Sequence, residues 1–186
     1  MTELPRPGLP PALQVRLRRM AMLVRILILI GAFSSIAGTF WVWVLPGHAA
    51  ATIKEAASVN IGTLALRYQV LGGLWSCLPL CIVLLGLLRL WQLFGEYACA
   101  RVFSHRALVS LRGFARCMLV MGFVEPLYGA VLSVLMTWDR APGTRELNMG
   151  FDTDNFAVVL VGAVMLAIST VMAEAARVAE DNAGFV

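Results

Sequence analysis

Apolar residues fill four long stretches of the chain, and polar residues gather between them. The apolar stretches cover about residues 22–45, 70–94, 113–138 and 156–178. A helix needs about 20 mainly apolar residues to cross the roughly 30 Å hydrocarbon core of a bilayer. Each stretch meets that length. The pattern therefore predicts an all-α integral membrane protein that forms a four-helix bundle.

The polar segments divide the chain into an arm and a membrane domain. We expect a basic N-terminal arm over residues 1–21 and a four-span membrane domain over residues 22–186. Ser104 stands where a helix cap is expected, which predicts a helix over about residues 105–137 that continues into the third span. In the same way, Asp154 is expected to cap the fourth helix.

Composition and charge exclude several other classes of protein. Hydrophobic residues make up 60% of the chain and charged residues 14%, against about 25% charged residues in a typical soluble domain. The 15 Lys and Arg residues mostly flank the apolar stretches, a placement that indicates topology signals and not a nucleic-acid-binding patch. We therefore expect no nucleic-acid partner.

The basic residues also predict which side each end of the chain occupies. With four spans, both termini lie on one side of the membrane. That side collects most of the positive charges: Arg6, Arg16, Arg18, Arg19, Arg25, Arg89, Arg101, Arg106, Arg112, Arg116 and Arg177. The positive-inside rule then places both termini in the cytoplasm. Tryptophans near the ends of the spans are expected to lie in the headgroup layers.

Small residues recur on each span at helical spacing and predict the faces through which the helices pack. The predicted faces are Gly31, Ser34, Ser35 and Gly38 on the first span, Gly73, Cys77 and Cys81 on the second, Gly122, Gly129 and Ser133 on the third, and Ala163, Ala167, Thr170 and Glu174 on the fourth.

Glu125 is the residue that most invites a functional hypothesis. It lies near mid-depth of the third span, where an isolated carboxylate costs at least about 2.5 kcal/mol. Residues expected at a similar depth on other spans are Ser34, Ser35, Ser169 and Thr170. One hypothesis is a polar cluster that binds a proton, a cation or a polar ligand. The alternative is a neutral acid that ties the helices together by hydrogen bonds.

A second group of charged residues is expected at the cytoplasmic interface. It consists of Arg89, Arg116, Glu174 and Arg177. We expect these side chains to anchor the helices and to form one or two ion pairs, with a site for an anionic lipid headgroup as the alternative.

No motif for catalysis, metal binding or cofactor binding occurs. The four cysteines and two histidines show no metal-ligand spacing, and no phosphate-binding loop or nucleophile motif is present. We therefore expect no enzymatic activity, no metal and no cofactor.

Two blocks of sequence resemble a family of bacterial membrane proteins. The first is Leu90-Trp91-Gln92-Leu93-Phe94-Gly95-Glu96-Tyr97 followed by Val102-Phe103-Ser104, and the second is Glu174-Ala175-Ala176-Arg177-Val178-Ala179-Glu180-Asp181-Asn182. They resemble the four-span family catalogued as domain of unknown function 2975. Ala100 departs from the glycine expected three residues before Phe103. The resemblance implies four spans and brings no established activity.

These observations favour a non-catalytic membrane module that acts as a sensor or regulatory partner. The alternative is a small transporter or channel subunit that uses Glu125. A membrane enzyme that acts on lipid ranks third, because no interfacial cluster of His, Asp or Cys is evident. The expected partners are membrane lipid, a cytoplasmic regulatory protein and further copies of the chain.

Overall fold

Four long helices make up nearly all of the described part of the chain. The computed structural model describes residues 11–44, 48, 66–99, 101, 104–139, 147 and 149–183. The helices are α1 (Pro11–Val44), α3 (Leu66–Ala98), α4 (His105–Thr137) and α5 (Thr153–Ala183), and no strand occurs in the ranges just given. Each helix contains a stretch long and apolar enough to cross a membrane. The predicted all-α membrane bundle is confirmed.

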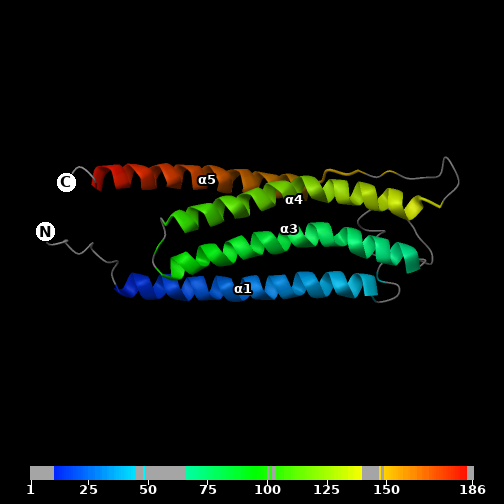
Figure 1. The fold of residues 1–186 in the computed structure, drawn as a ribbon, viewed down its shortest axis with the longest axis horizontal. Coiled ribbons are helices and arrows are strands. Elements are labelled where there is room, and N and C mark those ends of the chain that lie inside the picture. The colour runs from blue at the N-terminus through cyan, green and yellow to red at the C-terminus, as the bar shows by residue number, and fades with distance from the viewer. Residues whose placement is uncertain are drawn as a thin grey trace.

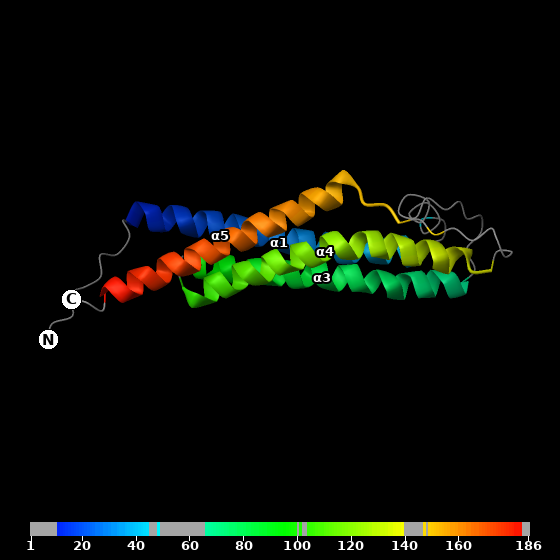
Figure 2. The same cartoon turned by 90° about the horizontal axis from the view of Figure 1, so that it is seen from above.

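The helices form a row in the order of the sequence. The main packing contacts join α1 to α3, α3 to α4 and α4 to α5, and Figure 1 shows the four helices side by side in that order. Figure 2 shows that α5 crosses α4 obliquely. It also shows that α1 and the first part of α5 lie on the same side of the α3–α4 pair. The bundle is therefore an open, curved row in which the first and last helices do not close over the middle pair.

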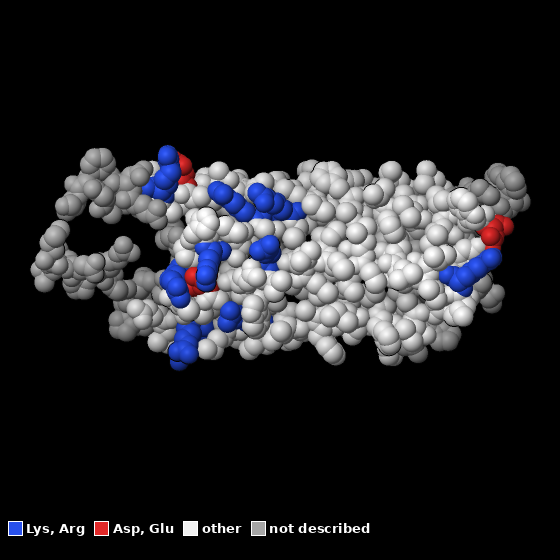
Figure 3. Space-filling model, viewed as in Figure 1, with Lys and Arg blue, Asp and Glu red and all other residues white. Residues whose placement is uncertain are grey.

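Charges lie mainly at one end of this row (Figure 3). Among the described Lys and Arg residues, only Arg67 lies at the opposite end, where it forms an ion pair with Asp139 between α3 and α4. Arg67 and Arg89 are 22 residues apart on α3, which corresponds to about 33 Å of helix. That distance matches the thickness of a bilayer's hydrocarbon core. The end where the other arginines gather is called the basic end below.

The helix boundaries follow local signals in the sequence. Pro11 begins α1, eleven residues before the expected span, because a proline fits the first helical turn without losing a hydrogen bond. Ser104 caps α4 by accepting a hydrogen bond from the backbone N–H of Ala107 at 3.1 Å, as expected. Asp154 is not a cap. Because α5 already begins at Thr153, Asp154 lies in the first turn, where a negative charge favours the helix dipole.

Glycine provides the close contact between α4 and α5, as the sequence predicts for α4. A Cβ at Gly122 would collide with the Val159 side chain and lie 3.3 Å from the backbone oxygen of Asn155. Gly129 and Ser133 on the same stripe are also buried.

The packing faces predicted for α3 and α5 are wrong in most positions. Cys77 and Cys81 of α3 are exposed, and α3 packs instead through Gly72, Ser76 and Gly86. The predicted α5 positions Ala163, Ala167, Thr170 and Glu174 are all exposed, whereas Asn155, Gly162 and Ser169 are buried. On α1, a Cβ at Gly31 or Gly38 would meet no heavy atom within 4 Å, so these glycines make no close helix contact.

Aromatic rings hold the first three helices together near the end that carries Arg67. Trp43 is buried with Leu132 and Met136, and its ring occupies the space that the missing side chain of Gly72 leaves open. Trp75 stacks on Tyr128 and donates a hydrogen bond to the Tyr128 backbone oxygen at 3.3 Å. Trp43 and Trp75 are therefore interhelical contacts more than headgroup markers.

Candidate functional site

A groove between α1, α3 and α4 contains Glu125. Its cavity has a volume of about 330 Å³. The residues that line it are Ser35, Gly38, Thr39, Val42, Trp43, Ser76, Pro79, Leu80, Val83, Met121, Glu125 and Tyr128. Three helices thus contribute hydroxyl groups to one apolar groove that carries a single carboxyl group.

The hydroxyl groups in the groove make hydrogen bonds that fix their positions. Ser76 Oγ lies 2.7 Å from the Tyr128 hydroxyl and 2.9 Å from the Gly72 backbone oxygen. Ser35 and Thr39 donate to backbone oxygens one turn earlier on α1, at 2.8 Å and 2.9 Å. These oxygen atoms still have lone pairs free to accept a hydrogen bond from a bound group.

Glu125 lies near the middle of the membrane-spanning region. It is 9 residues from Arg116 and 12 residues from Thr137, the last residue of α4, or about 14 Å and 18 Å. In the described part of the chain, no side chain or backbone group forms a hydrogen bond or ion pair with its carboxyl group. An unpaired acid at this depth is costly, so this is the position at which a bound group would contribute most.

Glu125 is nevertheless exposed along the groove, which differs from the expected burial against protein. Gly122, about one turn before it, packs against α5, and Tyr128 contacts α3. The carboxyl group lies between these two contacts, on the face of α4 that α1 and α5 leave open.

Only part of the predicted mid-membrane cluster comes together. Glu125 and Ser35 line the same groove, whereas Ser34 is exposed outside it. Ser169 is buried and donates to the Leu166 backbone oxygen at 2.7 Å, and Thr170 donates to the same oxygen at 3.0 Å. Both lie on α5, which does not line the groove.

Three groove residues were missed at the level of sequence: Thr39, Ser76 and Tyr128. Tyr128 lies three residues after Glu125 on the same helix face, and Ser76 lies four residues after Gly72. Helical spacing from Glu125 could have identified Tyr128.

The predicted interfacial charges do not form one group. Glu174 and Arg177 form an exposed ion pair at 2.6 Å within α5. Arg89 donates a hydrogen bond to the Gln92 side chain at 3.5 Å. Arg116 is exposed and pairs with no described residue.

Residues of the first of the two sequence blocks that resemble the family stabilise the connection between α3 and α4. Glu96 accepts a hydrogen bond from the Ser104 hydroxyl at 3.0 Å and lies 3.8 Å from Arg101 Nε. Leu93 packs with Ala107 and Leu111 across the two helices, and Phe94 and Tyr97 pack against this cluster. The block therefore joins two helices at the basic end. Phe103 lies outside the described residues.

Metal ligands do not gather in the part of the chain that the structure describes. No group of three His, Cys, Asp or Glu side chains with a geometry for metal binding occurs there. The four cysteines are free, and three of them are exposed.

The fold and the groove define a multi-pass helical membrane protein. The family model described as protein of unknown function (DUF2975) matches residues 47–184, so the chain belongs to this family. The match covers α3, α4 and α5 and begins after α1. No curated protein and no solved structure matches the chain significantly.

Proposed function

We propose that this protein is a non-catalytic module of the bacterial inner membrane, with both termini in the cytoplasm, that acts by binding as a sensor or regulatory partner. The observation that carries the proposal is the unpaired Glu125 carboxyl group in a groove built by three helices. The spread of the described arginines supports the orientation, because positive residues are retained on the cytoplasmic side.

The groove suits a proton, a cation or a small polar ligand. Glu125 supplies the charge or the proton, and the hydroxyls of Ser35, Thr39 and Tyr128 supply neutral hydrogen-bonding groups. Apolar residues such as Val83 and Leu80 complete the wall. A few polar groups in a mostly apolar concave site are typical of small-ligand sites.

A carbodiimide that partitions into lipid tests whether Glu125 is an accessible acid. Dicyclohexylcarbodiimide reacts with protonated carboxyl groups in apolar surroundings. We expect the peptide that contains Glu125 to be modified in the purified protein, as measured by mass spectrometry. Modification of this peptide should be lost in Glu125→Gln and retained in the matched control Glu174→Gln, whose site lies in an exposed ion pair.

An unmodified Glu125 peptide in the wild-type protein would contradict the groove as a binding site. It would favour a carboxyl group sealed within the helix packing, which is the structural alternative.

The regulatory part of the proposal places the cytoplasmic partner at the α3–α4 connection. Glu96 contacts both Ser104 and Arg101 there, and Arg101 is exposed. A photo-crosslinking residue at position 101 should yield a protein adduct in cells. The same residue at exposed position 149, at the other end of the helices, should not yield that adduct. Equal adducts at both positions would count against this partner surface.

A second candidate function is a small transporter or channel subunit that uses Glu125. The groove favours this function because the Glu125 carboxyl group lies at mid-depth and neither α1 nor α5 covers it. One row of four helices encloses no pore, so this function needs several copies of the chain. Proteoliposomes should then show cation or proton flux that Glu125→Gln abolishes. No flux above that of empty liposomes would contradict this candidate.

A further inference from the structure

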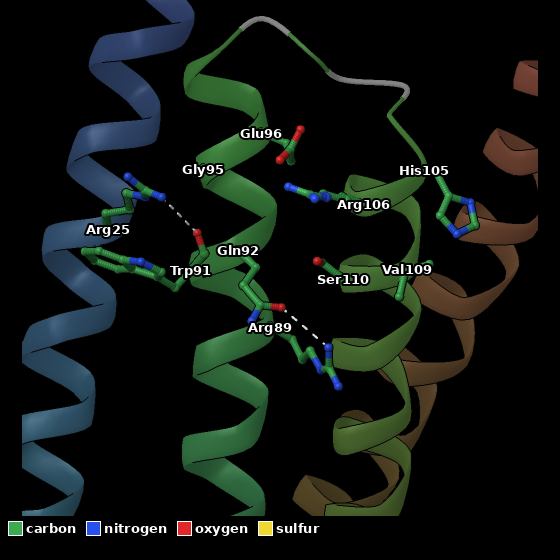
Figure 4. A pocket seen from close by; sticks show the side chains of 10 residues that line it. All are labelled: Arg25, Arg89, Trp91, Gln92, Gly95, Glu96, His105, Arg106, Val109 and Ser110. Atoms are coloured by element: carbon green, nitrogen blue, oxygen red, sulfur yellow. Dashed lines mark hydrogen bonds between the residues drawn. The ribbon is translucent and has the colours of Figure 1, made fainter.

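A second and larger cavity lies at the basic end, between α1, α3 and α4. Its volume is about 680 Å³. The residues that line it, shown in Figure 4, are Arg25, Arg89, Trp91, Gln92, Gly95, Glu96, His105, Arg106, Val109 and Ser110. None of them lines the groove around Glu125.

Arg25 is held at this cavity by α3. Its guanidinium group lies over the Trp91 ring, 4.5 Å from the ring centroid, and its Nη2 donates to the Trp91 backbone oxygen at 3.4 Å. The Nε atom of Arg25 is buried and has no hydrogen-bond partner in the described chain. The Arg25 guanidinium group therefore keeps hydrogen-bonding capacity that the described residues do not satisfy.

Two glycines make room for the arginine side chains. A Cβ at Gly95 would collide with the Nη2 atom of Arg25. A Cβ at Gly113 would lie 3.0 Å from Cδ and 3.1 Å from Nε of Arg89. Arginines from two helices therefore lie flat against the backbone of a neighbouring helix, in positions that a larger residue would disturb.

The net charge of the cavity is positive. Arg25, Arg89 and Arg106 contribute three guanidinium groups, and Figure 4 shows Arg106 extending toward Glu96. Glu96 is the one acid in the lining, and it already accepts from Ser104 and pairs with Arg101. Ser110 and Gln92 add neutral hydrogen-bonding groups. The site thus presents more cationic donors than it can neutralise by itself.

We propose that this cavity binds a phosphate-bearing anion, with Arg25 on the α1 side of α3 and Arg89 and Arg106 on its α4 side as cationic donors, and Gln92 and Ser110 as further donors. The guanidinium fork matches the geometry of phosphate oxygens and forms strong charge-assisted hydrogen bonds. The cavity lies at the depth expected for lipid headgroups, because Arg89 is about 33 Å along α3 from Arg67. The phosphate belongs either to an anionic lipid or to a small cytoplasmic phosphate compound. This inference does not rest on the function proposed for the Glu125 groove.

The experiment measures thermal unfolding of delipidated protein in dodecyl maltoside, a detergent without phosphate. One arm adds phosphatidylglycerol, and the other adds sodium phosphate with sodium chloride of equal ionic strength as the reference. The variants are Arg25→Gln/Arg89→Gln and the matched control Arg18→Gln/Arg116→Gln, which removes two exposed arginines at the same end. Size-exclusion chromatography and circular dichroism check that each variant is folded.

We expect at least one of the two phosphate sources to raise the unfolding temperature of the wild-type protein. The concentration needed for half of this effect should rise about 100-fold in the double cavity variant and stay within about twofold in the control, since each lost charge-assisted bond weakens binding about tenfold. An effect of phosphatidylglycerol alone identifies a lipid headgroup, and an effect of free phosphate identifies a soluble compound.

Gly95→Ala keeps the test decisive if the double variant does not fold. It preserves every charge and displaces only the Arg25 guanidinium group, so binding should weaken about tenfold. The proposal is overturned if neither source stabilises the wild-type protein. It is also overturned if the control variant loses as much affinity for phosphate as the double cavity variant. The same holds if the folded Gly95→Ala protein needs no higher phosphate concentration than the wild type.

Discussion

Glu96 and Glu125 are both acids in apolar helices, and their surroundings differ. Glu96 receives a hydrogen bond from Ser104 and an ion pair from Arg101, which compensate its partial burial at the basic end. Glu125 has neither kind of partner in the described chain, although it lies deeper. The partners of Glu96 give it a structural role, whereas the proposed function assigns Glu125 a binding role, because an uncompensated acid in a membrane is costly.

Replacing Ser104 tests the first of these assignments. Ser104→Ala removes the helix cap on the Ala107 N–H and the hydrogen bond to Glu96, which should lower the stability of the α4 start by about 1 kcal/mol. Hydrogen exchange at the first turn of α4 should become faster. Ser34→Ala is the matched control, because Ser34 is exposed on α1. Unchanged exchange in Ser104→Ala would show that the cap does not hold this connection.

At the residue scale, the sequence identified the acid of the groove but only part of its surroundings. Depth along each helix placed Ser169 and Thr170 at the level of Glu125, yet α5 packs on another face of α4. Hydropathy reports how deep a residue lies and does not report which helices are neighbours. The hydrogen-bonded pair of Ser76 and Tyr128 could not be predicted from the sequence, because it depends on α3 and α4 being neighbours.

At the scale of helices, the spacing of small residues predicted the packing face of α4 but failed at most positions on α3 and α5. Gly122 packs closely against α5, whereas Ala163 and Ala167 of α5 are exposed. Alanine is small on every face of a helix, so its spacing does not identify a contact. The buried face of α5 instead carries Asn155, Gly162 and Ser169.

A pair of glycine variants tests the packing of α4 on α5. Gly122→Ala should lower the stability by about 1–3 kcal/mol, because the added methyl group collides with Val159 and has a backbone oxygen beside it. Gly31→Ala on α1 should be neutral or slightly stabilising, because nothing lies within 4 Å of the new Cβ. Thermal unfolding in detergent measures both. A loss of stability that is equal in the two variants would contradict the α4–α5 contact.

For the whole molecule, the sequence predicted the four spans and the start of α4 at His105. It did not predict an open row, because an apolar helix face is equally suited to lipid and to another helix. The row leaves the Glu125 groove accessible. Most of the described arginines lie at one end of the helices (Figure 3), as their positions along the sequence predict.

The most direct test of the account is the sidedness of two connections in intact cells. Single cysteines at Arg101 and at Met149, introduced after the native cysteines are replaced by serine, are treated with a membrane-impermeant maleimide. Both positions are exposed. Arg101 lies between α3 and α4, and Met149 lies shortly before α5, and the end of α3 and the start of α5 lie toward opposite ends of the row (Figure 1). We expect labelling at position 149 from outside the inner membrane, and at position 101 only after the membrane is permeabilised. Labelling of both positions from outside, or of position 101 alone, would contradict a membrane-spanning bundle whose basic end faces the cytoplasm.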